Sequence, residues 1–168
     1  MIRSPMEVEE PINGKAVVAD ARPDAAVRIV GALLALAVAA VHVADQGGVT
    51  AFGSPDWLGW AYRLVEVGGV LTAVVLLAPR ASRLGWSAAV LLGVGPFLGY
   101  LVSRTVGVPG DSSDVGNWGY WVGTVSLFVE AALVVLAIGT LVAERQHSSS
   151  RTLRVLTAAD LLGAKTHG

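Results

Sequence analysis

The chain has 168 residues, of which 54% are hydrophobic and 15% are charged, and its formal net charge is −1 at pH 7. With a mean hydropathy of +0.62 it cannot build an ordinary water-facing surface, which indicates a membrane protein. The scattered Lys and Arg argue against nucleic-acid binding. The absence of cysteine excludes disulfides, thiolate metal sites and cysteine nucleophiles.

The first 26 residues mix acidic, basic and proline residues without periodicity, so we expect a mobile cytoplasmic tail. They contain no apolar stretch long enough for a secretory signal. The first apolar run is therefore expected to be kept as a membrane helix.

Four apolar runs predict an all-α membrane protein with four transmembrane helices in an up-down bundle (residues 27–143). At ~1.5 Å per residue, each run is long enough to cross a hydrocarbon core of ~30 Å. Tryptophans open the second and fourth runs, as interfacial aromatics often do. The predicted helices are about 27–44, 57–78, 84–102 and 118–143.

The third run contains Pro96, which removes a backbone donor and predicts a kink. Gly95 and Gly99 are four residues apart, a spacing that lets another helix approach closely. Residues 144–168 turn polar and form a predicted cytoplasmic tail. Its leucines make an imperfect amphipathic pattern, so a short helix on the membrane surface and a frayed tail both remain open.

The basic residues predict the orientation. All but one of those flanking the apolar runs fall on one side, and Arg104 alone lies in the opposite loops. The positive-inside rule then places both termini in the cytoplasm of a multi-pass plasma-membrane protein.

A weak internal repeat relates the second and fourth runs. Each opens with tryptophan and reaches a Val-Glu step, at Glu66 or Glu130, before a Val- and Leu-rich half. Two pseudo-repeated hairpins would then be related by an axis along the membrane normal. Chance similarity explains the pattern equally well.

Ionisable residues gather at one depth. Counted at ~1.5 Å per residue, His42 lies ~21 Å from Arg28, Glu66 ~20 Å from Pro79 and Glu130 ~21 Å from Glu144. An ionisable group at such a depth costs at least ~2.5–3.5 kcal/mol when unpaired, which makes the layer a candidate site. If the protein is an enzyme, the candidate catalytic residues are Glu130, Glu66 and His42; candidate ligand-binding residues are Arg63, Tyr100, Arg104, Asp45, Trp118 and Trp121.

Structural alternatives account for the same residues. Glu66 can pair with Arg63 three residues earlier, His42 with Asp45, and Arg104 can extend to the outer headgroups. A hydrogen-bonded network that only joins the helices would explain the whole layer. A purely structural role is hardest to assign to Glu130, because Ser126 is the only hydrogen-bond partner available to it on its own helix.

Three functions remain open. The layer could form an outward-facing pocket for a small ligand, ion or lipophilic substrate. It could belong to an accessory or assembly subunit of a homo-oligomer or larger membrane complex. It could also perform acid–base chemistry of isomerase, cyclase or hydrolase type on a lipophilic substrate. The cofactor is unknown; no metal motif is present, and a divalent metal, haem or quinone stays open.

One stretch resembles small integral membrane proteins of actinobacteria that have no assigned activity. The similarity lies in an S-R-T-x-G-[LV]-P segment, a D-x-G-N-W segment and a fourth helix with S-L-x-V-E, here between Ser103 and Glu130. The resemblance implies a four-helix topology and the importance of these residues, but no reaction.

Overall fold

The computed structural model describes residues 24–53 and 55–165, the last fifteen of them by their backbone alone. This part is entirely helical, with α1 (Ala25–Gln46), α2 (Asp56–Leu77), a 3₁₀ turn η1 (Pro79–Ala81), α3 (Ser82–Thr105) and α4 (Trp121–Lys165). Within it, four helical segments are long and apolar enough to cross a membrane. The predicted all-α fold with four spanning helices is confirmed. The predicted N-terminal tail, up to residue 23, lies outside the described residues.

Turn residues end the first two helices. The chain leaves α1 through Gly47 in the left-handed conformation (φ 91°), with Gly48 N–H donating to Val43 O at 2.9 Å. This is the usual glycine-terminated helix end. Pro79 lies two residues beyond Leu77, the last residue of α2, and its ring cannot continue the ladder of helical hydrogen bonds.

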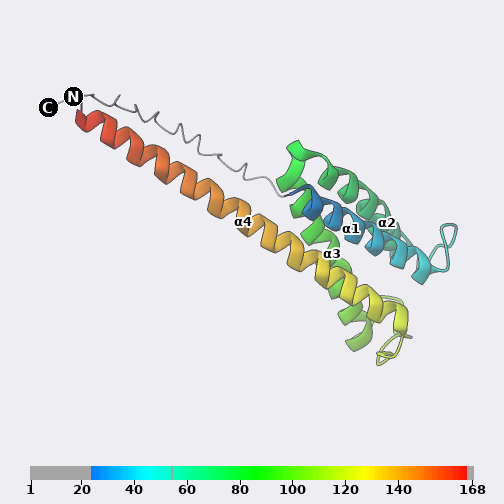
Figure 1. Ribbon diagram of the computed structural model, residues 1–168. Coiled ribbons are helices and arrows are strands. Elements are labelled where there is room, and N and C mark those ends of the chain that lie inside the picture. Colours follow the sequence, from blue (N-terminus) through cyan, green and yellow to red (C-terminus); the bar gives the residue numbers. More distant parts are fainter. Residues whose placement is uncertain (1–23, 54, 166–168) are drawn as a thin grey trace, which may run out of the picture.

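Consecutive helices form two antiparallel pairs. Arg28, near the start of α1, donates to the carbonyls of Leu76 and Leu77 at the end of α2. Ser82, at the start of α3, donates to Glu144 of α4 at 2.7 Å. The first pair packs against the second through α1 with α4 and α2 with α3 (Figure 1). We call the end of the bundle that holds Arg28 and Glu144 the basic end.

The buried apolar core lies in the half of the bundle toward the basic end. Small residues let the backbones approach: a Cβ on Gly69 of α2 would lie 2.7 Å from Ala35 O of α1. The core there is a cluster of completely buried side chains, which are Ala35, Leu76, Trp86, Ala89, Leu133 and Ala137. Large apolar side chains such as Val74 and Val135 point outward, as expected for helices surrounded by lipid.

The fourth helix is much longer than the apolar run predicts. Its apolar run ends near Ala143, and the helix continues to Lys165, well beyond the ends of the other three helices (Figure 1). No proline interrupts the polar segment after Ala143, so the helix persists outside the apolar region. The side chains that would make residues 151–165 amphipathic lie outside the described part.

Candidate functional site

A cavity of about 800 Å³ lies between the helices in the half of the bundle away from the basic end. We call it the interhelical cavity. All four helices and the α3–α4 loop line it. Its polar lining includes His42, Asp45, Tyr62, Tyr100, Arg104, Asp111, Asp114, Asn117, Tyr120, Ser126 and Glu130.

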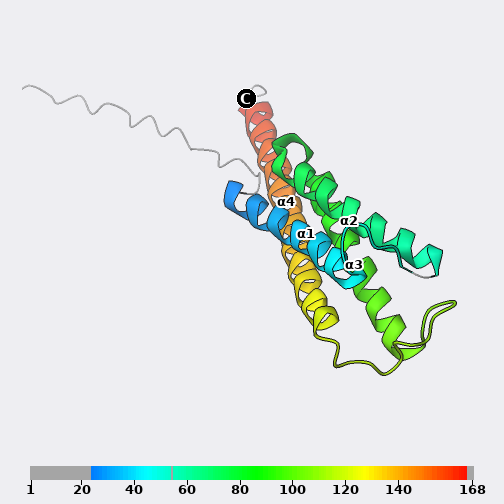
Figure 2. The same ribbon diagram turned by 90° about the vertical axis from the view of Figure 1, so that its right-hand side faces the viewer.

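The cavity has a polar end and an apolar end. The apolar end lies between α2 and α3 and is lined by Leu64, Gly68, Ala88, Leu91 and Leu92. Leu64 and Leu91 line the cavity although they are 76% and 74% exposed, so this wall reaches the outer surface of the bundle. The start of α2 and the end of α3 also diverge in both ribbon views (Figure 2). In a bilayer the opening would face lipid.

Two glycines of α3 widen the cavity instead of admitting a helix. Gly95 and Gly99 line it, and within the described part no atom lies within 4 Å of where a Cβ would stand on either. The expectation of a close helix contact at these positions is therefore wrong. Gly93 makes that contact, because a Cβ there would lie 2.9 Å from the carbonyl oxygen of Glu130.

Glu130 is buried in the wall of the cavity, with a side chain only 1% exposed. Ser126, one turn earlier in α4, donates to Glu130 Oε1 at 2.5 Å. Glu130 Oε2 has no hydrogen-bond partner among the described residues. A buried carboxylate oxygen without a donor is costly, so this atom is free to accept a hydrogen bond from a ligand.

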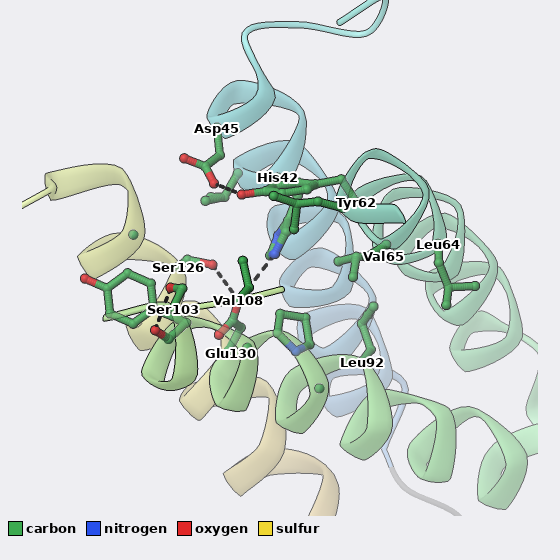
Figure 3. Close-up of a pocket in the computed structure, with 18 of the residues that line it drawn as sticks. His42, Asp45, Tyr62, Leu64, Val65, Leu92, Ser103, Val108, Ser126 and Glu130 are labelled. Carbon is green, nitrogen blue, oxygen red and sulfur yellow. Dashed lines mark hydrogen bonds and ion pairs between the residues drawn. The ribbon is translucent and has the colours of Figure 1, made fainter. Parts of the chain in front are cut away.

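His42 faces Glu130 from α1. Its Nδ1 lies 2.9 Å from Val38 O, and because a carbonyl only accepts, Nδ1 carries the proton. In the neutral ring Nε2 is then an acceptor. It lies 3.8 Å from Glu130 Oε1, beyond hydrogen-bond distance. Figure 3 shows His42 and Ser126 directed toward Glu130, with Leu64 and Leu92 away from this group.

Glu66 has a different environment, although it is also buried. Arg63 Nη1 donates to Glu66 Oε2 at 2.5 Å, and Gln46 Nε2 donates to Oε1 at 2.8 Å. Arg63 also donates to the carbonyls of Val49 and Ala51 in the α1–α2 loop. Neither Glu66 nor Arg63 is among the residues that line the cavity. Both carboxylate oxygens have donors, so this group joins α1, α2 and their loop.

The end of α3 is fixed to the loop that follows it. Arg104 is 5% exposed and forms an ion pair with Asp114 at 2.5 Å. Its guanidinium carbon lies 4.7 Å from the ring centre of Tyr100 and 5.8 Å from that of Tyr120. Arg104 is therefore buried beneath the α3–α4 loop and does not extend outward to the headgroups.

The α3–α4 loop also contacts the start of α2. Its tight turn is closed by the pairing of Val108 with Asp111, and Trp57 Nε1 of α2 donates to Pro109 O at 2.9 Å. Ser113 donates to Asp111 Oδ1 from its hydroxyl (2.7 Å) and its N–H (2.8 Å), which lowers the pKa of Asp111. The loop therefore forms a braced part of the cavity wall.

Two tyrosines hold Asp45 at the polar end. Tyr62 donates its hydroxyl hydrogen to Asp45 Oδ2, and its ring lies 5.6 Å from that of His42. Burial, together with the neighbouring Asp45 carboxylate, raises the pKa of Tyr120. Asp45 thus sits between the start of α2 and the start of α4.

The structure separates the sequence-predicted residues into two groups. His42, Asp45, Tyr100, Arg104 and Glu130 line the cavity; Glu66, Arg63, Trp118 and Trp121 do not. Trp118 packs against Tyr100 by its edge, and Trp121 is 72% exposed.

Sequence reasoning missed several lining residues. Tyr62 directly precedes Arg63 in α2 and contacts Asp45 and His42 of α1. Its position next to Arg63 in the sequence could have indicated that it lies near the same polar group. Asp114 and Tyr120 lie in a loop whose path gives no periodic signal. Among the described residues no three His, Asp or Glu side chains are placed to hold a metal ion.

Fold and site together define a polytopic membrane protein with an interhelical cavity. No family model, curated protein or solved structure matches the chain.

Proposed function

We propose that the protein binds a lipophilic molecule with a polar head in the interhelical cavity. The observation that carries this proposal is the two-ended lining: polar side chains line the end that holds Glu130, and an apolar wall reaches the surface of the bundle beside Leu64 and Leu91. A volume of about 800 Å³ is in the range of small-molecule sites.

The apolar wall suggests how such a ligand enters. A lipophilic molecule reaches the protein already dissolved in the bilayer, so an opening between α2 and α3 admits its chain without exposing it to water. The polar head then lies beside Glu130 and His42, where hydrogen bonds are strong because water is excluded.

We place the protein in the plasma membrane with the cavity toward the outer side. Arg28, Arg80 and Arg83 stand at the basic end, which the positive-inside rule assigns to the cytoplasm. The opposite end carries Arg104, which is buried and paired with Asp114. Both termini are then cytoplasmic.

An accessory or assembly role is the second candidate. The continuation of α4 to Lys165, beyond the apolar part of the helix, favours it, because a helix outside the bundle offers a surface to a partner. On this account the cavity would have no ligand.

Filling the cavity tests the proposal. Gly95→Leu places a side chain in open space within the lining, whereas Gly139→Leu adds the same side chain to α4 outside the cavity, also with no atom within 4 Å. Both changes also raise helix propensity. The measurement is mass spectrometry of organic extracts from each protein after purification in detergent.

We expect one lipophilic compound to co-purify with the wild type and Gly139→Leu and to be lost from Gly95→Leu. Identical extracts from all three proteins would contradict a ligand in the cavity and favour the accessory role.

A further inference from the structure

We infer that the ligand of the interhelical cavity is a lipophilic ammonium ion, meaning a protonated primary or secondary amine on an apolar chain. The inference rests on the proposed function and names the class of its ligand. It follows from the hydrogen-bond acceptors, the charges and the aromatic rings of the lining.

Glu130 and His42 offer hydrogen-bond acceptors in the lining of the cavity. Glu130 Oε2 has no hydrogen-bond partner among the described residues, and the Glu130 side chain is only 1% exposed. In the neutral ring of His42, Nε2 is an acceptor as well, because Nδ1 donates to Val38 O. A head that satisfies both atoms must bring N–H or O–H donors.

The charges of the lining select among such donors. Four carboxylates line the cavity, at Asp45, Asp111, Asp114 and Glu130, against one arginine, Arg104. Arg104 is already paired with Asp114. The surplus of negative charge attracts a cation and repels an anion, and low-dielectric walls strengthen both effects.

Aromatic rings of the same cavity already hold a cation. The guanidinium of Arg104 lies over Tyr100 and within 5.8 Å of Tyr120, a geometry of cation–π attraction. Tyr62 adds a third ring next to His42. The cavity therefore already holds one cation between a carboxylate and aromatic faces, and an ammonium head would meet a further carboxylate at Glu130.

The apolar end explains the chain of the ligand. A chain leaving the head toward α2 and α3 passes Gly95, Leu92 and Gly68 and reaches the lipid-facing Leu64 and Leu91. Such a ligand is either a free amine or the headgroup of an ammonium lipid. Both present the same chemistry to Glu130.

Three probes with one chain length test the inference: dodecylammonium, dodecanol and dodecanesulfonate. Each is radiolabelled and partitioned at equilibrium into phosphatidylcholine nanodiscs that contain the protein, and binding to protein-free nanodiscs is subtracted. We expect dodecylammonium to bind about tenfold or more tightly than dodecanol, since a charge-assisted bond replaces a neutral one. Dodecanesulfonate should bind least.

Two matched variants locate the selectivity. Glu130→Gln keeps the shape of the side chain and removes its charge, so the preference for dodecylammonium should fall to about that of dodecanol. Glu66→Gln makes the same change at a buried glutamate outside the lining, and its folded fraction should keep the preference. Thermal unfolding of both variants confirms that each is compared in its folded state.

The outcomes are distinct. The ammonium inference is overturned if dodecanol or the sulfonate binds as tightly as dodecylammonium or more tightly. It is also overturned if the preference for dodecylammonium survives Glu130→Gln. In either case, loss of probe binding in Gly95→Leu would still support a lipophilic ligand in the cavity. Absence of specific binding by all three probes overturns both proposals. Adding phosphatidylethanolamine separates the two sources, because competition identifies a lipid headgroup and its absence a free amine.

Discussion

Glu66 and Glu130 lie at corresponding places in α2 and α4, yet their surroundings differ. Glu66 receives a donor on each oxygen, from Arg63 and Gln46, and lies outside the cavity. Glu130 lines the cavity and receives one donor, from Ser126, while its other oxygen has no hydrogen-bond partner among the described residues. Burial alone therefore does not mark a binding site. The two glutamates differ in that Glu130 lines the cavity and has an acceptor oxygen without a donor among the described residues.

The same difference separates the two halves of the bundle. Toward the basic end, small residues bring the helices into contact around Trp86 and Leu76. Away from it, α2 and α3 diverge, and open space remains beside Gly95 and Gly99. We expect the closed half to carry most of the stability and the open half to carry binding.

The largest effect should come from breaking the closed half. Trp86→Ala removes a completely buried side chain that packs against Gly31 and Leu76, and should cost about 3–5 kcal/mol. Chemical unfolding in detergent measures the loss. The folded fraction should still bind dodecylammonium. Abolished binding at unchanged stability would contradict the division into two halves.

Removing the partner of Glu66 should have the next largest effect. Arg63→Ala leaves Glu66 with Gln46 alone and frees two loop carbonyls, so we expect a loss of about 2–3 kcal/mol. The value is below that of a fully buried pair because the Arg63 side chain is 24% exposed. Unfolding of Arg83→Met, whose arginine is 67% exposed, is the control and should differ little from wild type.

Arg104→Met should loosen the cavity wall with little change in stability. The variant loses the ion pair with Asp114 but no longer buries a charge, so the free energy of unfolding should change by less than about 1 kcal/mol. Hydrogen exchange in the α3–α4 loop should become faster. Unchanged exchange there would show that Trp57 and the turn of the loop hold it without Arg104.

The smallest effect concerns pH. Hydrogen bonds from Ser113 lower the pKa of Asp111, so their contribution is present at neutral pH and is lost as pH falls through that lowered value. Protection of the Ser113 N–H from exchange should therefore persist down to about pH 4, the ordinary range of Asp, and decline below it. Asp111→Asn should show no such acid transition.

The number and type of helices could be predicted from sequence because apolar length and composition determine them directly. The repeat, the up-down order relative to the membrane and the cytoplasmic termini stay predictions. The end of α4 could not be predicted, since the apolar signal stops near Ala143 while nothing in the next segment breaks a helix.

The site could be predicted only in part. Depth along each helix brought His42 and Glu130 to one level, and the structure brings them within 3.8 Å. Depth does not give the rotation of a helix about its axis, so it grouped Glu66 with them although Glu66 turns to Arg63 and Gln46. The position of Asp114 depends on the path of the α3–α4 loop. A loop has no regular periodicity from which that path could be predicted.

Glu66 joins the helices of the fold, and we propose that Glu130 binds a ligand. Parallel thermal unfolding and dodecylammonium binding of Glu66→Gln and Glu130→Gln test it most directly. We predict that Glu66→Gln lowers the melting temperature and keeps ligand preference, whereas Glu130→Gln keeps the melting temperature and loses the preference. A Glu130→Gln protein that is destabilised as much as Glu66→Gln and binds as the wild type does would contradict the claim.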